Sequence, residues 1–107
     1  MKKPPRIKIP EGIKAGDVIE IKSLILHPME TGFRVGTNGR MIPRNIIDRF
    51  TATWNGEEIF AMKLSPAIAA NPFVSFFTTA RESGRVTLRW SGDQNFLVEE
   101  SVVIAVE

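Results

Sequence analysis

Alternation of apolar and polar residues is the feature that most constrains how this chain can fold. Apolar residues recur at every second position along most of the sequence, and helical periodicity of any length is missing. Such a period of two is typical of half-buried β-strands. Four rows are expected to share a face each: Ile19, Ile21 and Ile25; Phe50, Ala52 and Trp54; Val86, Leu88 and Trp90; and, interrupted by Glu100, Phe96, Val98, Val102, Ile104 and Val106. The chain is therefore predicted to be all-β.

Turn signals divide the alternating runs into seven short strands. Asn55-Gly56 stands between two such runs, and this pair is the strongest short signal for a two-residue hairpin. A proline-containing segment, residues 65–72, predicts a single turn that crosses between sheets. Short strands with regularly spaced turns favour an immunoglobulin-like β-sandwich of about seven antiparallel strands. Residues 1–107 are expected to form one such domain.

The composition excludes several classes of function. Lysine and arginine exceed the acidic residues by only two, and they are scattered, so a nucleic-acid-binding face is disfavoured. The chain has no cysteine, which removes thiolate nucleophiles and cysteine-based metal sites. The acidic residues are dispersed and there is a single histidine, so neither a metal site nor a cofactor is predicted.

Residues 27–45 form a connection that is long for a compact sandwich, and are expected to be functional or mobile. The connection opens with "HPMETG" and holds the only histidine, His27. One interpretation makes His27 a partly buried hydrogen-bonding residue. The other makes it the base of a hydrolase, with Ser23 or Ser65 as nucleophile and Glu30 or Asp48 as orienting acid. No nucleophile elbow or related context supports the second, so no catalytic residue is predicted.

Four arginines lie in or just after this connection: Arg34, Arg40, Arg44 and Arg49. They could form a solvated rim, or they could recognise an anion or an acidic partner, because the planar guanidinium pairs well with carboxylates and oxyanions.

The strand faces suggest that something covers the outside of the sandwich. With Trp54 opposite Glu57, a regular hairpin turns three apolar residues to the outer face: Phe60, Met62 and Leu64. In the next run, Phe73 and Phe77 face away from the core. An antiparallel sheet normally needs apolar residues on one face only. The long connection, a sheet edge that folds over, or a partner subunit is expected to cover the second face.

Four motifs resemble one known family. "HPMETG" (27–32), "IPRNII" (42–47), "FTATWNGEEIF" (50–60) and "ANPFVSFF" (70–77) are similar, in this order, to the SoxZ family of bacterial sulfur oxidation. The resemblance runs from about Arg6 to the last residue. It implies an immunoglobulin-like, non-catalytic subunit in a tight heterodimer with SoxY, which carries sulfur intermediates on a cysteine. It also implies transient docking to the enzymes of the pathway.

The resemblance changes the expected location of the protein. The opening "MKKPPRIKIP" has no apolar segment typical of an export signal, which by itself favours the cytoplasm. SoxZ-like proteins are instead carried to the periplasm with a signal-bearing partner, so periplasmic co-export is expected. No membrane insertion is expected.

The residues expected at the interface with the partner are His27, Pro28, Met29, Glu30, Thr31, Gly32, Arg44, Phe60 and Met62. An alternative function is an immunoglobulin-like accessory or interaction module unrelated to sulfur.

Overall fold

The computed structural model describes residues 4–107, and they form seven strands. The strands are β1 (Arg6–Lys8), β2 (Val18–Leu24), β3 (Ile47–Trp54), β4 (Glu57–Lys63), β5 (Phe73–Thr79), β6 (Gly84–Gly92) and β7 (Phe96–Ile104). No helix occurs in this part of the chain. The predicted all-β class and the number of strands are confirmed.

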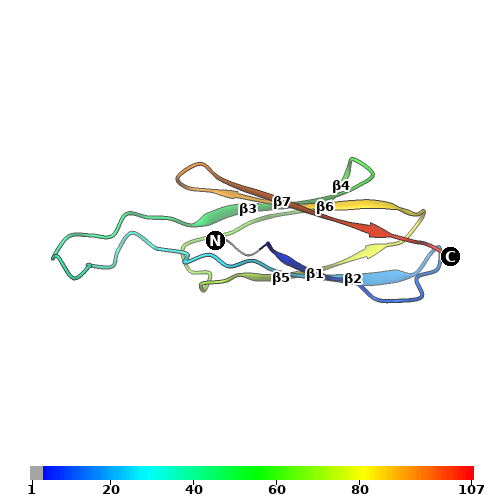
Figure 1. The fold of residues 1–107 in the computed structure, drawn as a ribbon, viewed down its shortest axis with the longest axis horizontal. Helices are drawn as coiled ribbons and strands as arrows, with labels where there is room; N and C mark the ends of the chain where they lie inside the picture. Colours follow the sequence, from blue (N-terminus) through cyan, green and yellow to red (C-terminus); the bar gives the residue numbers. More distant parts are fainter. Residues whose placement is uncertain (1–3) are drawn as a thin grey trace.

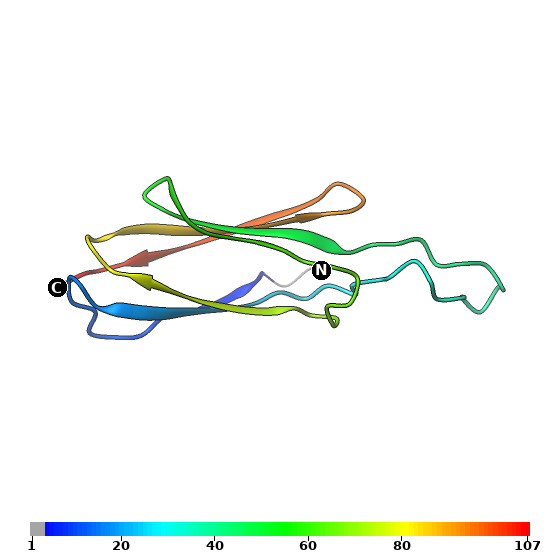
Figure 2. The ribbon, with the colours of Figure 1, turned by 180° about the vertical axis from the view of Figure 1, so that it is seen from behind.

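The strands lie in two sheets that pack face to face, as Figure 1 shows. One sheet has three strands in the order β1-β2-β5, and the other has four in the order β4-β3-β6-β7. Every pair is antiparallel. Figure 2 shows the same two layers from behind. This arrangement confirms the predicted immunoglobulin-like sandwich.

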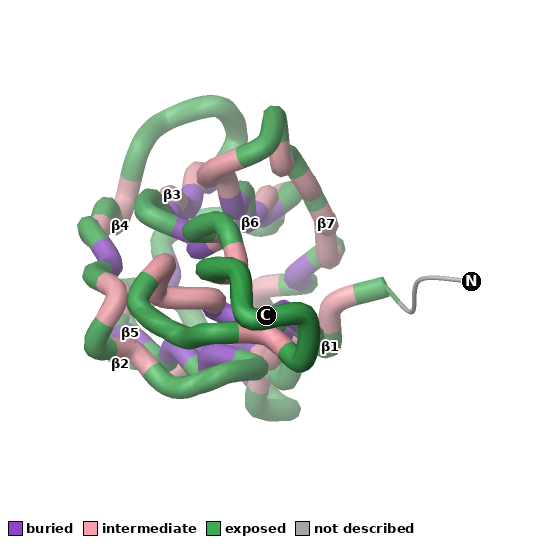
Figure 3. The backbone as a smooth tube through the Cα atoms, turned by 90° about the vertical axis from the view of Figure 1, so that its left-hand side faces the viewer, coloured by how far each residue is buried: buried purple, intermediate pink, exposed green. Residues whose placement is uncertain are grey.

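The core lies between the sheets, where the buried segments gather in Figure 3. Three of the four predicted rows are buried, and Phe50, Leu88 and Trp90 are fully inaccessible to solvent. In the fourth row Ile104 is buried and the other residues are half-buried against the core. The rings of Phe50 and Trp90 lie 5.3 Å apart between their centroids. The two tryptophans belong to this core, since Trp54 is 8% exposed and Trp90 is completely covered.

The Asn55-Gly56 turn joins β3 and β4 as predicted. Asn55 has a φ of 51° and Gly56 a φ of 85°, the positive values that a tight hairpin turn requires. The Asn55 side chain also accepts a hydrogen bond from the Arg85 backbone N–H at 3.0 Å. The turn is thereby tied to β6.

The prediction for the outer face of β4 is wrong, because a β-bulge shifts its register. Thr53 faces Glu58, but Ala52 faces Phe60, so Ile59 is an extra residue without a partner in β3. Beyond Ile59, the β4 side chains that a regular hairpin would turn outward therefore point inward, and the reverse holds for their neighbours. Phe60 turns inward and stacks on Phe76, with centroids 4.8 Å apart and an interplanar angle of 8°.

The same bulge places the remaining predicted outer residues inside the sandwich. Met62 pairs with Phe50 and is half-buried against the core, and Leu64 is buried. In β5, by contrast, the prediction is confirmed, since Phe73 is 61% and Phe77 is 66% exposed. The exposed phenylalanines of the sandwich therefore lie on the three-stranded sheet, while β7 of the four-stranded sheet exposes Leu97 and Val103.

Residues 65–72 cross from β4 in one sheet to β5 in the other, as predicted. The Ile68 N–H donates to the Ser65 carbonyl at 3.0 Å and closes one turn. Across residues 4–107, the structure contains no helix long and apolar enough to cross a membrane. The expectation about an export signal partly concerns residues 1–3, which lie outside the described residues.

Candidate interaction site

The long connection projects from one end of the sandwich, as Figure 1 shows. We call residues 30–45 the arm. At its base Glu30 and Asn45 exchange two backbone hydrogen bonds of 2.8 Å, and farther out Val35 pairs with Met41. The molecule measures 57 × 26 × 19 Å along its principal axes. The predicted loop is thus a narrow two-stranded ribbon.

His27 is a buried residue at the point where the chain leaves the sandwich. Its side chain is 4% exposed, and Nδ1 accepts a hydrogen bond from the Met29 N–H at 3.0 Å. Its backbone N–H donates to Asn71 Oδ1 at 2.9 Å, and its ring packs edge-on against Phe96. The interpretation of His27 as a hydrogen-bonding residue is confirmed, and its burial is more complete than expected.

The serines considered as partners of His27 make hydrogen bonds elsewhere. The buried Ser23 hydroxyl donates to the Val74 carbonyl at 2.8 Å. Ser65 Oγ accepts a hydrogen bond from the Ala67 N–H at 3.3 Å. These bonds serve the β2–β5 pairing and the crossing turn, so they do not support the hydrolase interpretation.

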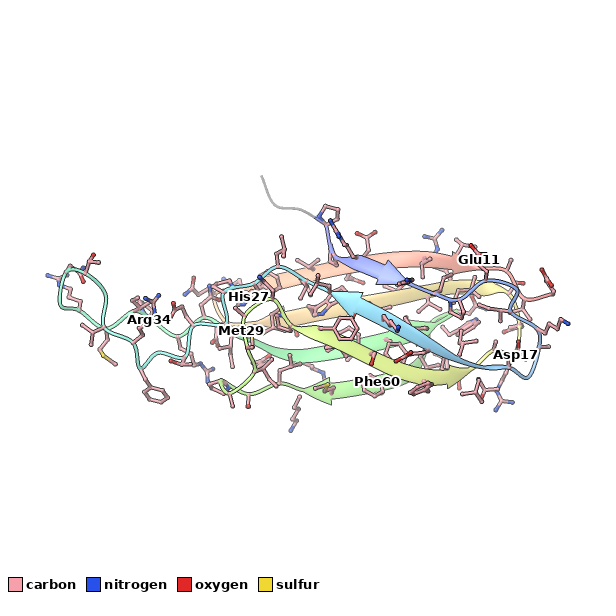
Figure 4. The ribbon with its side chains drawn as sticks, turned by 90° about the horizontal axis from the view of Figure 1, so that it is seen from below. Glu11, Asp17, His27, Met29, Arg34 and Phe60 are labelled. Atoms are coloured by element: carbon pink, nitrogen blue, oxygen red, sulfur yellow. The ribbon has the colours of Figure 1, made fainter. Side chains whose placement is uncertain are left out.

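Met29 anchors the arm to the first residue of β3. It is 5% exposed, and its sulfur accepts a hydrogen bond from the Ile47 N–H at 3.2 Å. Its backbone has a φ of 50°, which is uncommon outside glycine and fits the sharp bend. Figure 4 shows His27 and Met29 close together at the base, with Arg34 farther along the arm.

Arg44 holds the other side of the base through Asp93, in the turn between β6 and β7. The guanidinium makes two hydrogen bonds of 2.8 Å to the two carboxylate oxygens. Asp93 also accepts a hydrogen bond from the Ile46 N–H at 3.1 Å. The hydrogen bonds from Arg44, followed by the bond from Ile46, lower the pKa of Asp93 below its ordinary value. Arg44 is thus a positioning residue for the arm.

Gly32 faces Arg44 across the ribbon. A Cβ added to Gly32 would lie 3.0 Å from the Arg44 Cβ, and Gly32 has a φ of +89°. Both facts favour glycine at this position. Beside it, Thr31 Oγ1 accepts a hydrogen bond from the Phe33 N–H at 3.1 Å, while Pro28 is exposed to solvent.

The arginines do not form one anion site. Arg34 makes an ion pair with Glu30 within the arm, and Arg44 is bound to Asp93. Arg40 lies at the turn of the arm, and Arg49 lies in β3. Among residues 4–107, Arg34 and Arg44 are the arm arginines that make an ion pair. Arg40 is therefore the arm's cation without an acidic partner in the described structure.

The structure brings most of the predicted interface residues together and separates two of them. The run His27–Gly32 and Arg44 meet at the base of the arm, whereas Phe60 and Met62 are half-buried inside the sandwich. Sequence reasoning missed the exposed apolar residues of the arm. Phe33 is 80%, Val35 57% and Met41 53% exposed. The alternation of "FRV" was the available signal, and it was obscured by the glycines that follow.

A hollow of about 690 Å³ lies beside His27. Its lining comes from the N-terminal segment and from β7 among other elements, and its apolar part includes Ile25, Phe96 and Val98. Within residues 4–107 no group of three or more histidine, cysteine, aspartate or glutamate side chains is placed to hold a metal ion.

Comparison with known proteins gives a family and several structural relatives. Residues 7–103 match the family described as "Sulphur oxidation protein SoxZ". No curated protein matches the sequence significantly.

Among solved structures, a superoxide reductase (neelaredoxin) from Ignicoccus hospitalis has a TM-score of 0.72 at 20% identity. The match covers 98% of this chain and 81% of that one. The sulfur carrier protein SoxY from Chlorobium limicola f thiosulfatophilum has a TM-score of 0.67 at 12% identity, with 99% and 81% covered. At these identities the similarity establishes a shared fold.

Proposed function

This chain belongs to the SoxZ family of sulfur oxidation proteins, and from that premise we propose that it is the non-catalytic subunit of a sulfur-carrier heterodimer. Its partner is a SoxY-like protein that holds the sulfur intermediate covalently on a cysteine. None of the 107 residues of this chain is a cysteine, so the sulfur is assigned to the partner. The family match over residues 7–103 is the observation that carries the proposal.

The exposed apolar residues support an obligate partner. Phe33, Phe73 and Phe77 are each more than half exposed, and Phe73 and Phe77 lie on the same face of β5. Large exposed apolar patches are uncommon on monomers. Permanent complexes cover such side chains at interfaces that resemble a divided core. In this complex the chain stabilises the carrier and supplies surface that successive enzymes recognise.

Size measurements of the chain and a SoxY-like partner, separately and after co-expression, test the proposed heterodimer. We expect a one-to-one complex that survives dilution to submicromolar concentration, together with association or poor solubility of the chain alone. A monodisperse, folded monomer with no affinity for the partner contradicts the proposal.

The "HPMETG" loop is proposed to shape a surface for the cysteine-bearing segment of the partner or for the enzymes that dock on the complex. Glu30 and Arg44 bring charge to this surface, and each is held by an ion pair. Glu30→Ala and Arg44→Ala should therefore change dimer affinity or sulfur-transfer turnover, measured separately. If neither quantity changes, the role of the loop is disproved.

Periplasmic location is part of the same proposal. The folded heterodimer is exported by the signal of the partner. Cell fractionation should find this chain in the periplasm when the partner carries its signal, and in the cytoplasm when that signal is deleted. Export without the partner would contradict co-export.

A further inference from the structure

We infer that the apolar face of the arm is the main contact of this chain with its partner subunit; the inference rests on the heterodimer proposed above. The face consists of Phe33, Val35 and Met41, which we call the arm face. Its expected counterpart is an apolar surface of the partner with a carboxylate at its edge.

The backbone pairing places Val35 and Met41 on one side of the ribbon. Val35 and Met41 are bridge partners, so their side chains project from the same face. The Ile42 N–H donates to the Arg34 carbonyl at 2.8 Å, and the Gly36 N–H donates to the Arg40 carbonyl at 2.8 Å, which continues the same register. Phe33 lies two residues before Val35, the spacing at which side chains of an extended strand project to the same side. All three are more than half exposed.

The outer part of the arm has little support from the rest of the molecule. A two-stranded ribbon without a covering layer is marginally stable in water. His27, Met29 and the Arg44–Asp93 pair hold only the base. The outer part has one bridge, and its apolar side is open to solvent. Phe73 and Phe77, by comparison, stand on β5, an edge strand that β2 pairs along its whole length.

Charge selects the occupant. Arg34 pairs with Glu30 and Arg44 with Asp93, which leaves Arg40, at the turn of the arm, as the arm's cation without an acidic partner in the described structure. The arm of a second copy would offer Arg40 only Glu30, the one acidic residue among residues 30–45, which is already paired with Arg34. A carboxylate of a different subunit would pair with Arg40 without that competition. A different subunit with an acidic rim therefore fits better than a homodimer.

Matched double variants test the inference, with affinity for the purified SoxY-like partner as the readout. Phe33→Ser/Val35→Ser changes the arm face, and Phe73→Ser/Phe77→Ser changes the outer face of the three-stranded sheet at residues of similar exposure. We expect the arm variant to lose at least about 100-fold in affinity and the sheet variant to lose less than about threefold. Unchanged urea midpoints will show that both variants are folded, since none of the four side chains is in the core.

The outcomes separate this inference from the proposed function. Equal losses, or a larger loss in the sheet variant, overturn the arm assignment while the heterodimer stands. No binding by the unmodified chain overturns both. A homodimer of the free chain that the arm substitutions dissociate assigns the arm to a second copy and also overturns the inference.

A charge variant tests the selection by Arg40. Arg40→Glu should slow association with the partner about tenfold at low salt, and the difference should shrink as salt screens the charges. Arg85→Glu, on the four-stranded sheet, is the matched control and should leave the rate nearly unchanged. An equal effect of both substitutions contradicts a specific contact at Arg40.

Discussion

His27 and Met29 connect the sandwich to the arm through groups that solvent does not reach. The His27 ring fills space beside Phe96 and accepts the Met29 N–H, while Met29 covers the start of β3. A buried N–H without an acceptor costs about 1–3 kcal/mol. These residues therefore matter first for the stability of the arm base.

Replacing His27 tests this structural role. His27→Ala should lower the free energy of unfolding by about 2–4 kcal/mol, because it leaves a cavity and removes the acceptor of a buried N–H. His27→Asn, which keeps a short acceptor, should lower it less. Urea denaturation gives both values. An alanine variant as stable as the unmodified protein would refute the structural role.

The Arg44–Asp93 pair makes the arm base sensitive to acid. Because the folded-state pKa of Asp93 is lowered, its contribution to stability is present above the unfolded pKa of about 3.9 and is lost as pH falls through the folded value. We therefore expect the stability difference between the unmodified protein and Asp93→Asn to shrink when pH is lowered from about 7 to about 3. Urea titrations at each pH measure it. A difference independent of pH contradicts the assignment.

The bulge in β4 shows how one extra residue changes which side chains of an edge strand face the core. Ile59 has no partner in β3, and the side chains beyond it change faces. Phe60 consequently joins Phe50 and Phe76 in an aromatic cluster, at centroid distances of 6.1 and 4.8 Å. The strand closes the core at the edge of the four-stranded sheet.

Two phenylalanines on different faces test the bulge. Phe60→Ala should lower the free energy of unfolding by about 2–3 kcal/mol, because it removes a half-buried ring that stacks on Phe76. Phe77→Ala, whose side chain is 66% exposed, should change it by no more than about 0.5 kcal/mol. Chemical denaturation compares them. Equal effects would contradict the inward placement of Phe60.

The molecule as a whole is a sandwich with a ribbon extending from one end. Its outer surfaces differ: β3 and β6 present Arg49 and Arg89 to solvent, whereas the three-stranded sheet and the arm present exposed phenylalanines. An elongated body with a projecting apolar ribbon is suited to reach over a second subunit. The shape thus agrees with the proposed heterodimer, in which the arm contacts the partner.

Limited trypsin digestion tests this arrangement without substitutions. In the free chain, cleavage should begin after Arg40 at the turn of the arm, while Arg89 in β6 resists because its backbone is paired with strands on both sides. Adding the SoxY-like partner should slow cleavage after Arg40 at least about tenfold. Mass spectrometry identifies the cut sites. Equal cleavage after Arg40 with and without the partner would argue against a covered arm.

Local periodicity was sufficient to predict the sandwich, because in β2 and β6 every second residue faces one layer, and in β3 the alternation holds from Phe50 to Trp54, beyond the register shift at Asp48. Asn55-Gly56 likewise specified its turn through backbone preferences that need no distant contact. The direction of the Phe60 side chain depended on a bulge in β4 against β3. The role of Arg44 depended on Asp93, 49 residues away. The arm face depended on the pairing between the two strands of the arm. These are non-local interactions, and a repeating pattern within one segment carries no information about the partner that the segment meets after folding.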